Sequence, residues 1–103
     1  MKSYQIFQVD DSKENARYIL FSGLEMVKHL GLTITRDKYQ KVYEGEIEES
    51  ENIYETLEQI FTKFNIGKKP EGYQGHSLSV SDIIAIDGKF YYCDDYGFEE
   101  IEF

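Results

Sequence analysis

Hydrophobic and polar positions alternate along two segments in the first half of the chain, which is the periodicity of a strand with one buried face. Residues 3–10 (SYQIFQVD) predict a first strand, and residues 39–47 (YQKVYEGEI) predict another. Residues 14–21 (ENARYILF) carry β-branched and aromatic side chains, which favour a short strand over a helix. The first half of the chain is therefore expected to supply three strands.

The C-terminal part of the chain combines apolar runs with turn residues. Asp87-Gly88 joins the two apolar halves of residues 82–94 (DIIAIDGKFYYCD), which is the pattern of a type I′ hairpin turn. Residues 97–103 (GFEEIEF) predict a closing strand, whose apolar positions are Phe98, Ile101 and Phe103.

Helical spacing is clearest in residues 50–65 (SENIYETLEQIFTKFN). Asn52 and Glu55 form a capping box at its start, and Asn65 or Gly67 can end the helix before Pro70. The positions expected to face the core are Ile53, Leu57, Ile60, Phe61 and Phe64.

A shorter helix is predicted after Ser22, which forms a capping box with Glu25. It carries Met26, Val27 and Leu30, and Gly31 closes it. With the strands, the order β-β-α-β-α-β-β-β predicts a single compact α+β domain over residues 1–103, mainly an antiparallel sheet with two helices.

Composition supports a folded domain in a reducing compartment. A hydrophobic content of 41% and an aromatic content of 16% supply the apolar surface that a core needs. The longest apolar stretch, 17–27, is too broken to span a bilayer, and residues 1–5 lack the apolar core of a secretion signal. Cys93 is the only cysteine, which excludes an internal disulfide and indicates the cytoplasm. We expect it to pack as a small apolar side chain.

The charge balance narrows the possible partners. Twenty acidic residues against eleven basic ones give a net charge of −9. Phosphate groups repel such a chain, so we expect neither direct nucleic-acid binding nor membrane binding, and attraction to basic protein surfaces instead.

The run GHSLSVSD at 75–82 gathers residue types that also occur in hydrolase active sites. However, the chain has no G-x-S-x-G elbow, and a histidine adjacent to a serine in sequence does not make a catalytic pair. We expect a turn at the glycine, serines and aspartate bonded to nearby backbone, and a histidine filling a polar gap beneath them. The residues expected to be structural are Gly75, His76, Ser77, Ser79, Ser81 and Asp82.

No metal or other cofactor is expected. His29, His76, Cys93 and Asp94-Asp95 do not have the spacing of a zinc site, and no calcium-binding loop pattern is present.

Two acidic runs, residues 44–58 and 94–102, are candidates for a binding surface. The first crosses a strand end, a loop and a helix start, so its charges are expected to converge on one rim. Tyrosine beside charge is typical of interfaces. The predicted partner-binding residues are Tyr43, Glu44, Glu46, Glu48, Glu49, Glu51, Tyr54, Glu55, Asp94, Asp95 and Tyr96.

The chain resembles a YodL-like domain nearly from end to end. The resemblance rests on YQIFQV at the start, VYEG at 42–45, FN at 64–65 before a proline, and GHSLSVSDII followed by YYCDDYGFEEI. The second motif has the form Y-x-D-x-x-GF, with Tyr92, Asp94, Gly97 and Phe98 at its defined positions. One departure is Gly72-Tyr73-Gln74, where the family usually has aspartate and phenylalanine before the GHS. The resemblance implies that GHSLSVSD is a scaffold signature.

The resemblance also implies a function. YodL-like domains are small proteins or modules of Gram-positive bacteria, often encoded on plasmids and integrative elements. This chain is similar to short YodL-like proteins that act as type II-A anti-CRISPRs. We therefore expect a non-enzymatic inhibitor, a monomer or weak dimer, that binds a type II CRISPR effector nuclease and interferes with guide RNA or target DNA binding.

Two alternatives stay open. One is an adaptor or regulatory module of mobile elements with an unrelated protein partner. The other is an enzyme centred on His76, Ser77 and Asp82.

Overall fold

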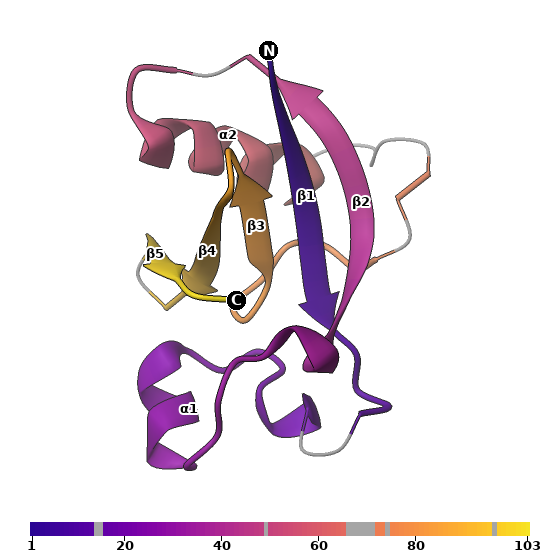
Figure 1. The fold of residues 1–103 in the computed structure, drawn as a ribbon, viewed down its shortest axis with the longest axis vertical. Helices are drawn as coiled ribbons and strands as arrows, with labels where there is room; N and C mark the ends of the chain where they lie inside the picture. Colours follow the sequence, from indigo (N-terminus) through magenta and orange to yellow (C-terminus); the bar gives the residue numbers. More distant parts are fainter. Residues whose placement is uncertain (14–15, 49, 66–71, 74, 96) are drawn as a thin grey trace.

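Five strands form one open antiparallel sheet in the part of the chain that this computed structural model describes, which is residues 1–13, 16–48, 50–65, 72–73, 75–95 and 97–103 (Figure 1). The strands are β1 (Lys2–Val9), β2 (Tyr39–Ile47), β3 (Ile83–Ile86), β4 (Lys89–Asp94) and β5 (Gly97–Ile101). Their order across the sheet is β2-β1-β3-β4-β5, so β2 and β5 are the edges. The predicted α+β class is confirmed.

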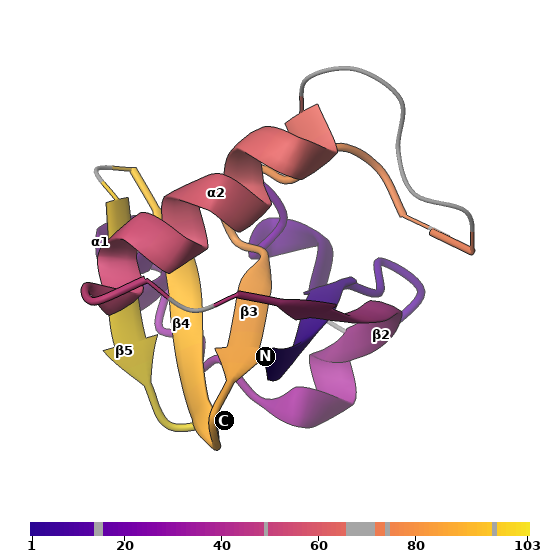
Figure 2. The ribbon, with the colours of Figure 1, turned by 90° about the horizontal axis from the view of Figure 1, so that it is seen from above.

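Two α-helices accompany the sheet, α1 (Leu24–His29) and α2 (Ile53–Asn65), with short 3₁₀ helices η1 (Ala16–Tyr18) and η2 (Arg36–Lys38). Helix α2 lies across one face of the sheet, and Figure 2 shows its N-terminal half above β4 and β5. Helix α1 lies beyond one end of the sheet in Figure 1.

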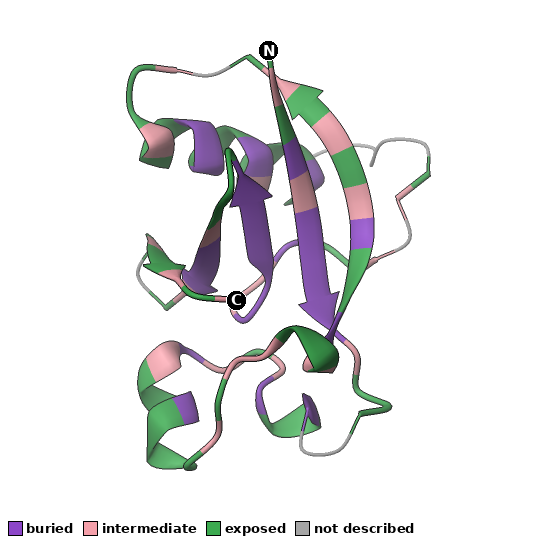
Figure 3. Ribbon diagram, in the orientation of Figure 1, coloured by how far each residue is buried: buried purple, intermediate pink, exposed green. Residues whose placement is uncertain are grey.

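The alternation of side chains along the strands divides the core into two layers. Tyr4, Ile6, Ile84 and Ile86 point toward α2, where they meet Leu57, Ile60 and Phe64. Phe7, Val9, Ile83 and Tyr92 point the other way, where they pack with Ala16, Ile19 and Val27. The central strand β3 is buried along its whole length because both layers cover it (Figure 3).

The hairpin between β3 and β4 has the predicted turn. Asp87 has φ 55° and Gly88 has φ 77°, and a type I′ turn requires positive φ at both central residues. The strand predicted at 39–47 matches β2, and the first predicted strand matches β1 within one or two residues at each end.

The strand predicted at 14–21 is wrong over residues 16–21, while residues 14–15 lie outside the described residues. Ala16, Arg17 and Tyr18 form η1, and Ala16 and Ile19 both have 0% of their surface exposed. Residues three apart lie on one side of a 3₁₀ turn, so both side chains reach the core together. Tertiary packing therefore overrides the strand preference of the β-branched and aromatic residues.

The capping box predicted at Ser22 is also wrong. Helix α1 begins after Gly23, and no side chain of its own segment caps it. The Ser22 hydroxyl instead donates to the carbonyl oxygen of Tyr18 (3.0 Å). Gly31, with φ 72°, follows the helix end as predicted.

For α2 the cap residue is confirmed, because the Asn52 side chain accepts a hydrogen bond from the Tyr54 amide (2.9 Å). The helix runs to Asn65, whereas Gly67 and Pro70 lie outside the described residues. Its buried positions are Thr56, Leu57, Ile60 and Phe64, while Ile53 and Phe61 are half-buried.

Candidate functional site

Asp82, the last residue of the GHSLSVSD run, is the buried end of a polar network. Its side chain has 0% of its surface exposed. The Oδ2 atom accepts hydrogen bonds from the Gln8 side chain (3.0 Å) and from the Ser79 amide (3.0 Å). The bond to Ser79 is local, as predicted, but the bond to Gln8 joins the loop to strand β1.

Gln8 is the centre of this network, and the sequence analysis missed it. Its Nε2 atom lies 3.0–3.1 Å from three acceptors, which are the Tyr73 hydroxyl, the carbonyl oxygen of His76 and Asp82 Oδ2, and 3.3 Å from Nδ1 of His76. An amide nitrogen has only two hydrogens, so at most two of these contacts are full hydrogen bonds. Gln8 lies on the same face of β1 as Tyr4 and Ile6, which is the face turned toward α2. A buried polar residue at such a position requires a hydrogen-bond partner.

Gly75 lies directly against the same side chain. A Cβ atom at this position would be 2.1 Å from Gln8 Oε1, which accepts a hydrogen bond from the His76 amide (3.2 Å). The glycine is thus required by a close approach between the loop and β1.

Ser81 joins the run to the first half of the chain. Its hydroxyl accepts a hydrogen bond from the Phe21 amide (3.0 Å), and its carbonyl oxygen accepts one from the Tyr39 hydroxyl (2.6 Å). This hydroxyl therefore bonds a distant segment and not its own loop, which corrects the local turn expected for it. Ser81 itself has φ 88°.

The carboxyl group of Asp82 is electrostatically unusual. Burial raises its pKa from an ordinary 3.8 to about 7, although the hydrogen bonds from Ser79 and Gln8 and the nearby His76 lower it. Among the described residues, neither Asp82 Oδ1 nor the Ser79 hydroxyl has a hydrogen-bond partner.

His76 lies at the surface, which corrects the expectation that it fills a gap beneath the serines. It is exposed, and its ring centroid is 5.7 Å from that of Phe21. Its Nδ1 atom is 2.6 Å from the carbonyl oxygen of Ser77. A carbonyl oxygen is not a nucleophile, so this contact is not the serine–histidine bond of a hydrolase.

The Y-x-D-x-x-GF motif holds the start of α1. The Tyr92 hydroxyl donates to the carbonyl oxygen of Ser22 (2.6 Å), and Asp94 Oδ1 accepts from the Leu24 amide (3.0 Å). Gly97 has φ 96° at the start of β5, and Phe98 packs edge-on against Phe61 (6.0 Å between ring centroids). The four motif residues therefore all act within the fold.

The first acidic run is divided between two places. Glu44 and Glu46 lie on edge strand β2 and are called here the β2 acidic surface. Strand alternation puts them on the face opposite α2, because Tyr43 and Ile47 pack toward α2. Glu44 is paired with Lys41 (2.9 Å) and accepts a bond from Gln5 (3.1 Å), contacts that lower its pKa.

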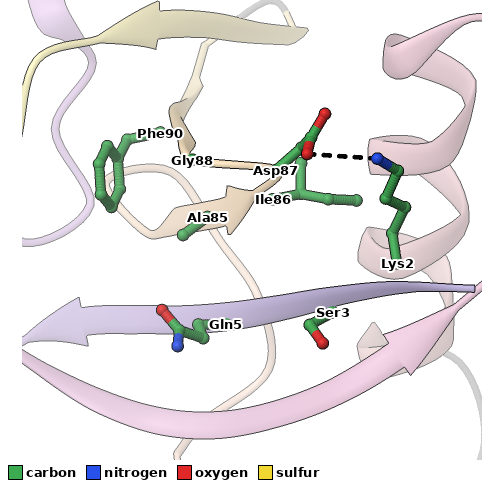
Figure 4. Close-up of a pocket in the computed structure, with 8 residues that line it drawn as sticks. All are labelled: Lys2, Ser3, Gln5, Ala85, Ile86, Asp87, Gly88 and Phe90. Carbon is green, nitrogen blue, oxygen red and sulfur yellow. Dashed lines mark ion pairs between the residues drawn. The ribbon is translucent and has the colours of Figure 1, made fainter.

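A shallow cavity of about 340 Å³ lies on this same face (Figure 4). Ser3 and Gln5 of β1, Ala85 of β3 and Phe90 of β4 line it, and an ion pair between Lys2 and Asp87 (3.2 Å) closes one side.

Glu55 and Glu58 of the first run lie on α2, whose N-terminal half is near the opposite edge of the sheet. Tyr54 has 48% of its surface exposed, and its ring is 6.4 Å from that of Tyr91 in β4. Glu55 and Glu58 are exposed on the same helix. The expectation of one rim is therefore replaced by two surfaces at opposite sheet edges.

A cavity of about 220 Å³ between α2 and the β4–β5 turn brings the two runs together, and is called here the α2–β5 groove. Sequence reasoning missed Glu58 and Phe61 as surface residues of this groove, since only the packing of α2 on β4 and β5 brings them to the second run. The residues that line it include Glu58, Phe61, Cys93, Asp94, Asp95 and Phe98.

The remaining predicted residues are placed as follows. Tyr43 is half-buried among aromatic rings, with Phe64 5.2 Å and Tyr73 6.0 Å away between centroids. Glu48 and Glu51 are exposed in the connection between β2 and α2. Glu49 and Tyr96 lie outside the described residues.

In the described part of the chain, no group of three or more His, Cys, Asp or Glu is placed to hold a metal ion. Cys93 is buried, and burial raises the pKa of its thiol well above the ordinary value. None of the described helices has the length and apolar character required to cross a bilayer.

These observations define a small α+β domain in which the polar motif residues fasten loops to an antiparallel sheet, while the exposed surface is strongly acidic. The chain belongs to the YodL-like domain family, whose model matches residues 3–103. No curated protein and no solved structure matches the chain.

Proposed function

We propose that this protein is a non-enzymatic inhibitor that binds a type II CRISPR effector nuclease and interferes with the binding of guide RNA or target DNA. The main support is the exposed acidic surface of the domain, above all the α2–β5 groove and the neighbouring Tyr54 and Glu55. A net charge of −9 favours encounter with a basic protein.

The proposed mechanism is competition for a basic channel. CRISPR nucleases hold nucleic acid in positively charged channels that recognise backbone shape and charge. Clustered carboxylates meet the same lysines and arginines, and an exposed aromatic ring such as Tyr54 supplies contact area at the centre of an interface. The nuclease without guide RNA offers the largest unpaired basic surface, so the inhibitor is expected to bind that form best.

The GHSLSVSD run supports a non-enzymatic role only indirectly. Asp82 Oδ2 accepts hydrogen bonds from Gln8 and Ser79, and the Ser81 hydroxyl accepts one from the Phe21 amide, so these side chains have partners within the fold. Their assigned part is to hold the domain together.

The test is a DNA cleavage assay with a type II effector nuclease, in which the protein is added either before or after the guide RNA. Stronger inhibition is expected when the protein is added first. Equal cleavage with and without the protein, in both orders and with several nuclease orthologues, contradicts the proposal. A stable unrelated partner recovered in a pull-down would then favour the adaptor role in a mobile element.

The His76→Ala variant tests the alternative that the protein is an enzyme. His76→Ala removes an exposed ring, so the variant is expected to stay folded and to inhibit as the unchanged protein does. A hydrolase activity that is lost in this variant would instead establish the enzyme.

A further inference from the structure

The α2–β5 groove has an apolar floor beneath a charged rim. Phe61 and Phe98 contact each other edge-on, at 6.0 Å between ring centroids, and both are half-buried. The cavity of about 220 Å³ is smaller than the roughly 300–1,000 Å³ that is typical of small-molecule sites, which favours a single long side chain as its occupant.

The rim carries only negative charge among the described residues. Glu58 comes from α2, and Asp94 and Asp95 come from the end of β4 and the turn that follows. Asp94 Oδ1 is occupied by the Leu24 and Asp95 amides. By contrast, Glu58 and Asp95 are exposed, and within the described residues no hydrogen bond or ion pair engages either carboxylate. The Asp95 carboxylate also lies beside Gly23 at the start of α1, where a Cβ atom would be 2.2 Å from its Oδ2.

We propose that the α2–β5 groove binds an arginine side chain of the partner protein. The arginine stem lies on Phe61 and Phe98, and its guanidinium group meets Glu58 and Asp95. The identity of the partner rests on the proposed function, and the arginine side chain is the chemical group by which that partner is recognised.

Arginine fits this combination of surfaces better than lysine does. The planar guanidinium stacks on aromatic faces, is weakly hydrated, and presents several N–H donors in a fixed geometry that matches carboxylates. Lysine is a compact, strongly hydrated charge, which gains less from an aromatic floor. Charge complementarity therefore selects a cation, and the paired rings select arginine among cations.

An arginine elsewhere in this chain packs against aromatic rings. The Arg36 guanidinium carbon lies 5.0–5.2 Å from the ring centroids of Phe7, Phe90 and Phe103. That site is on the opposite face of the sheet and is filled by the chain itself, whereas the described lining of the α2–β5 groove includes the exposed residues Glu58 and Asp95.

The test uses three probes with the full-length protein, which are the N-acetyl methylamides of arginine, lysine and norleucine. Each is titrated while amide chemical shifts are followed by NMR. The arginine probe is expected to produce saturable shifts at residues 58, 61, 94, 95 and 98, with weaker effects from lysine and none from norleucine.

Two variants with the same loss of charge provide the control. Glu58→Gln with Asp95→Asn is expected to weaken arginine binding about tenfold or more, because both charge-assisted bonds are lost. Glu44→Gln with Glu46→Gln removes the same charge from the β2 acidic surface, and is expected to change binding by less than about twofold, since distant exposed charges are screened.

Three results would overturn the inference: no saturable shift in the groove, equal binding of norleucine, or equal weakening by both variants. The titration contains no nuclease, so its outcome is separate from that of the proposed function. Groove binding without nuclease inhibition would retain the arginine site and reject the nuclease as partner. Nuclease inhibition without groove binding would retain the proposed function and reject the arginine site.

Discussion

Asp82 illustrates how one buried side chain links distant parts of this domain. Its carboxyl group is bonded to Gln8, which is 74 positions away in the sequence. The same group has no basic partner at hydrogen-bond distance among the described residues, and it titrates near pH 7 because burial disfavours the charged form. Stability is thus coupled to pH through a residue whose main contacts are neutral.

The sign of this coupling follows from the two pKa values. In the folded protein Asp82 keeps its proton up to about pH 7, whereas the unfolded chain releases it near pH 3.8. The folded state binds more protons between these values, so the free energy of unfolding is expected to fall as the pH rises from 4 to 7. At about 1.4 kcal/mol per pKa unit, the loss is on the order of 2–4 kcal/mol.

Asp82→Asn is expected to abolish most of this loss. The asparagine oxygen can accept the bonds from Gln8 and Ser79, and its NH₂ group takes the place of Oδ1, which has no partner among the described residues. Urea unfolding at pH 4 and pH 8 measures the difference, with exposed Asp11→Asn as the control. A wild-type protein whose stability does not decline relative to the Asp82→Asn variant between these pH values would contradict the assignment.

Helix α1 depends on a residue that is remote in sequence. Its six residues are too few to form a stable helix alone, and the Leu24 amide is bonded by Asp94 from the end of β4. Tyr92 holds the preceding carbonyl oxygen, that of Ser22. The Y-x-D motif is therefore a cap supplied in space by another element.

Asp94→Ala is expected to destabilise the protein by about 0.5–2 kcal/mol, the usual cost of losing a helix cap. Hydrogen exchange should accelerate first at the amides of residues 24–27. Ser22→Ala is the matched control, because its hydroxyl donates to the Tyr18 carbonyl oxygen at an exposed position. Equal acceleration in both variants would restore the capping box that the sequence predicts.

Helix α2 is held by burial and not by its cap. Leu57 and Ile60 have 0% of their surface exposed. Leu57→Ala is expected to cost about 2–5 kcal/mol in urea unfolding, through lost burial and a cavity. Gln59→Ala, on the exposed side of the same helix, should change stability by less than about 0.5 kcal/mol. A Leu57→Ala protein with an unchanged unfolding midpoint would mean that α2 is not docked on the sheet.

The distribution of charge over the domain decides how a basic partner would approach. The β2 acidic surface and the α2–β5 groove lie at opposite edges of the sheet, so one flat partner surface cannot engage both at close range. Glu44 is already paired with Lys41, and the groove is therefore expected to contribute more to binding.

Association with the proposed nuclease partner is expected to slow as salt is raised, because exposed charges more than about 8 Å apart are screened near physiological ionic strength. Reversal of Glu55 and Glu58 to lysine should lower the association rate more than reversal of Glu46 and Glu48. Stopped-flow or surface-plasmon measurements at several salt concentrations decide this. Rates that are insensitive to salt and to both reversals would exclude electrostatic steering.

Local periodicity determined much of this fold. Strands β1 and β2, the Asp87-Gly88 hairpin and helix α2 were all predictable, because alternation and helical spacing reflect which face of an element is buried. The α+β class followed from the order of these elements. The strongly acidic character of the surface followed from the charge count alone.

Contacts between residues distant in the sequence decided the features that local periodicity does not predict. Residues 16–18 form η1 because Ala16 and Ile19 have a core to enter, and Asp94 replaces Ser22 as the cap because β4 brings it to α1. Gln8 becomes the partner of Asp82 only when β1 lies beside the loop before β3. Packing also divides the first acidic run between β2 and α2 and brings Glu58 to the second run at the α2–β5 groove. Periodicity gives the orientation of side chains within one element, whereas a site depends on which elements pack together.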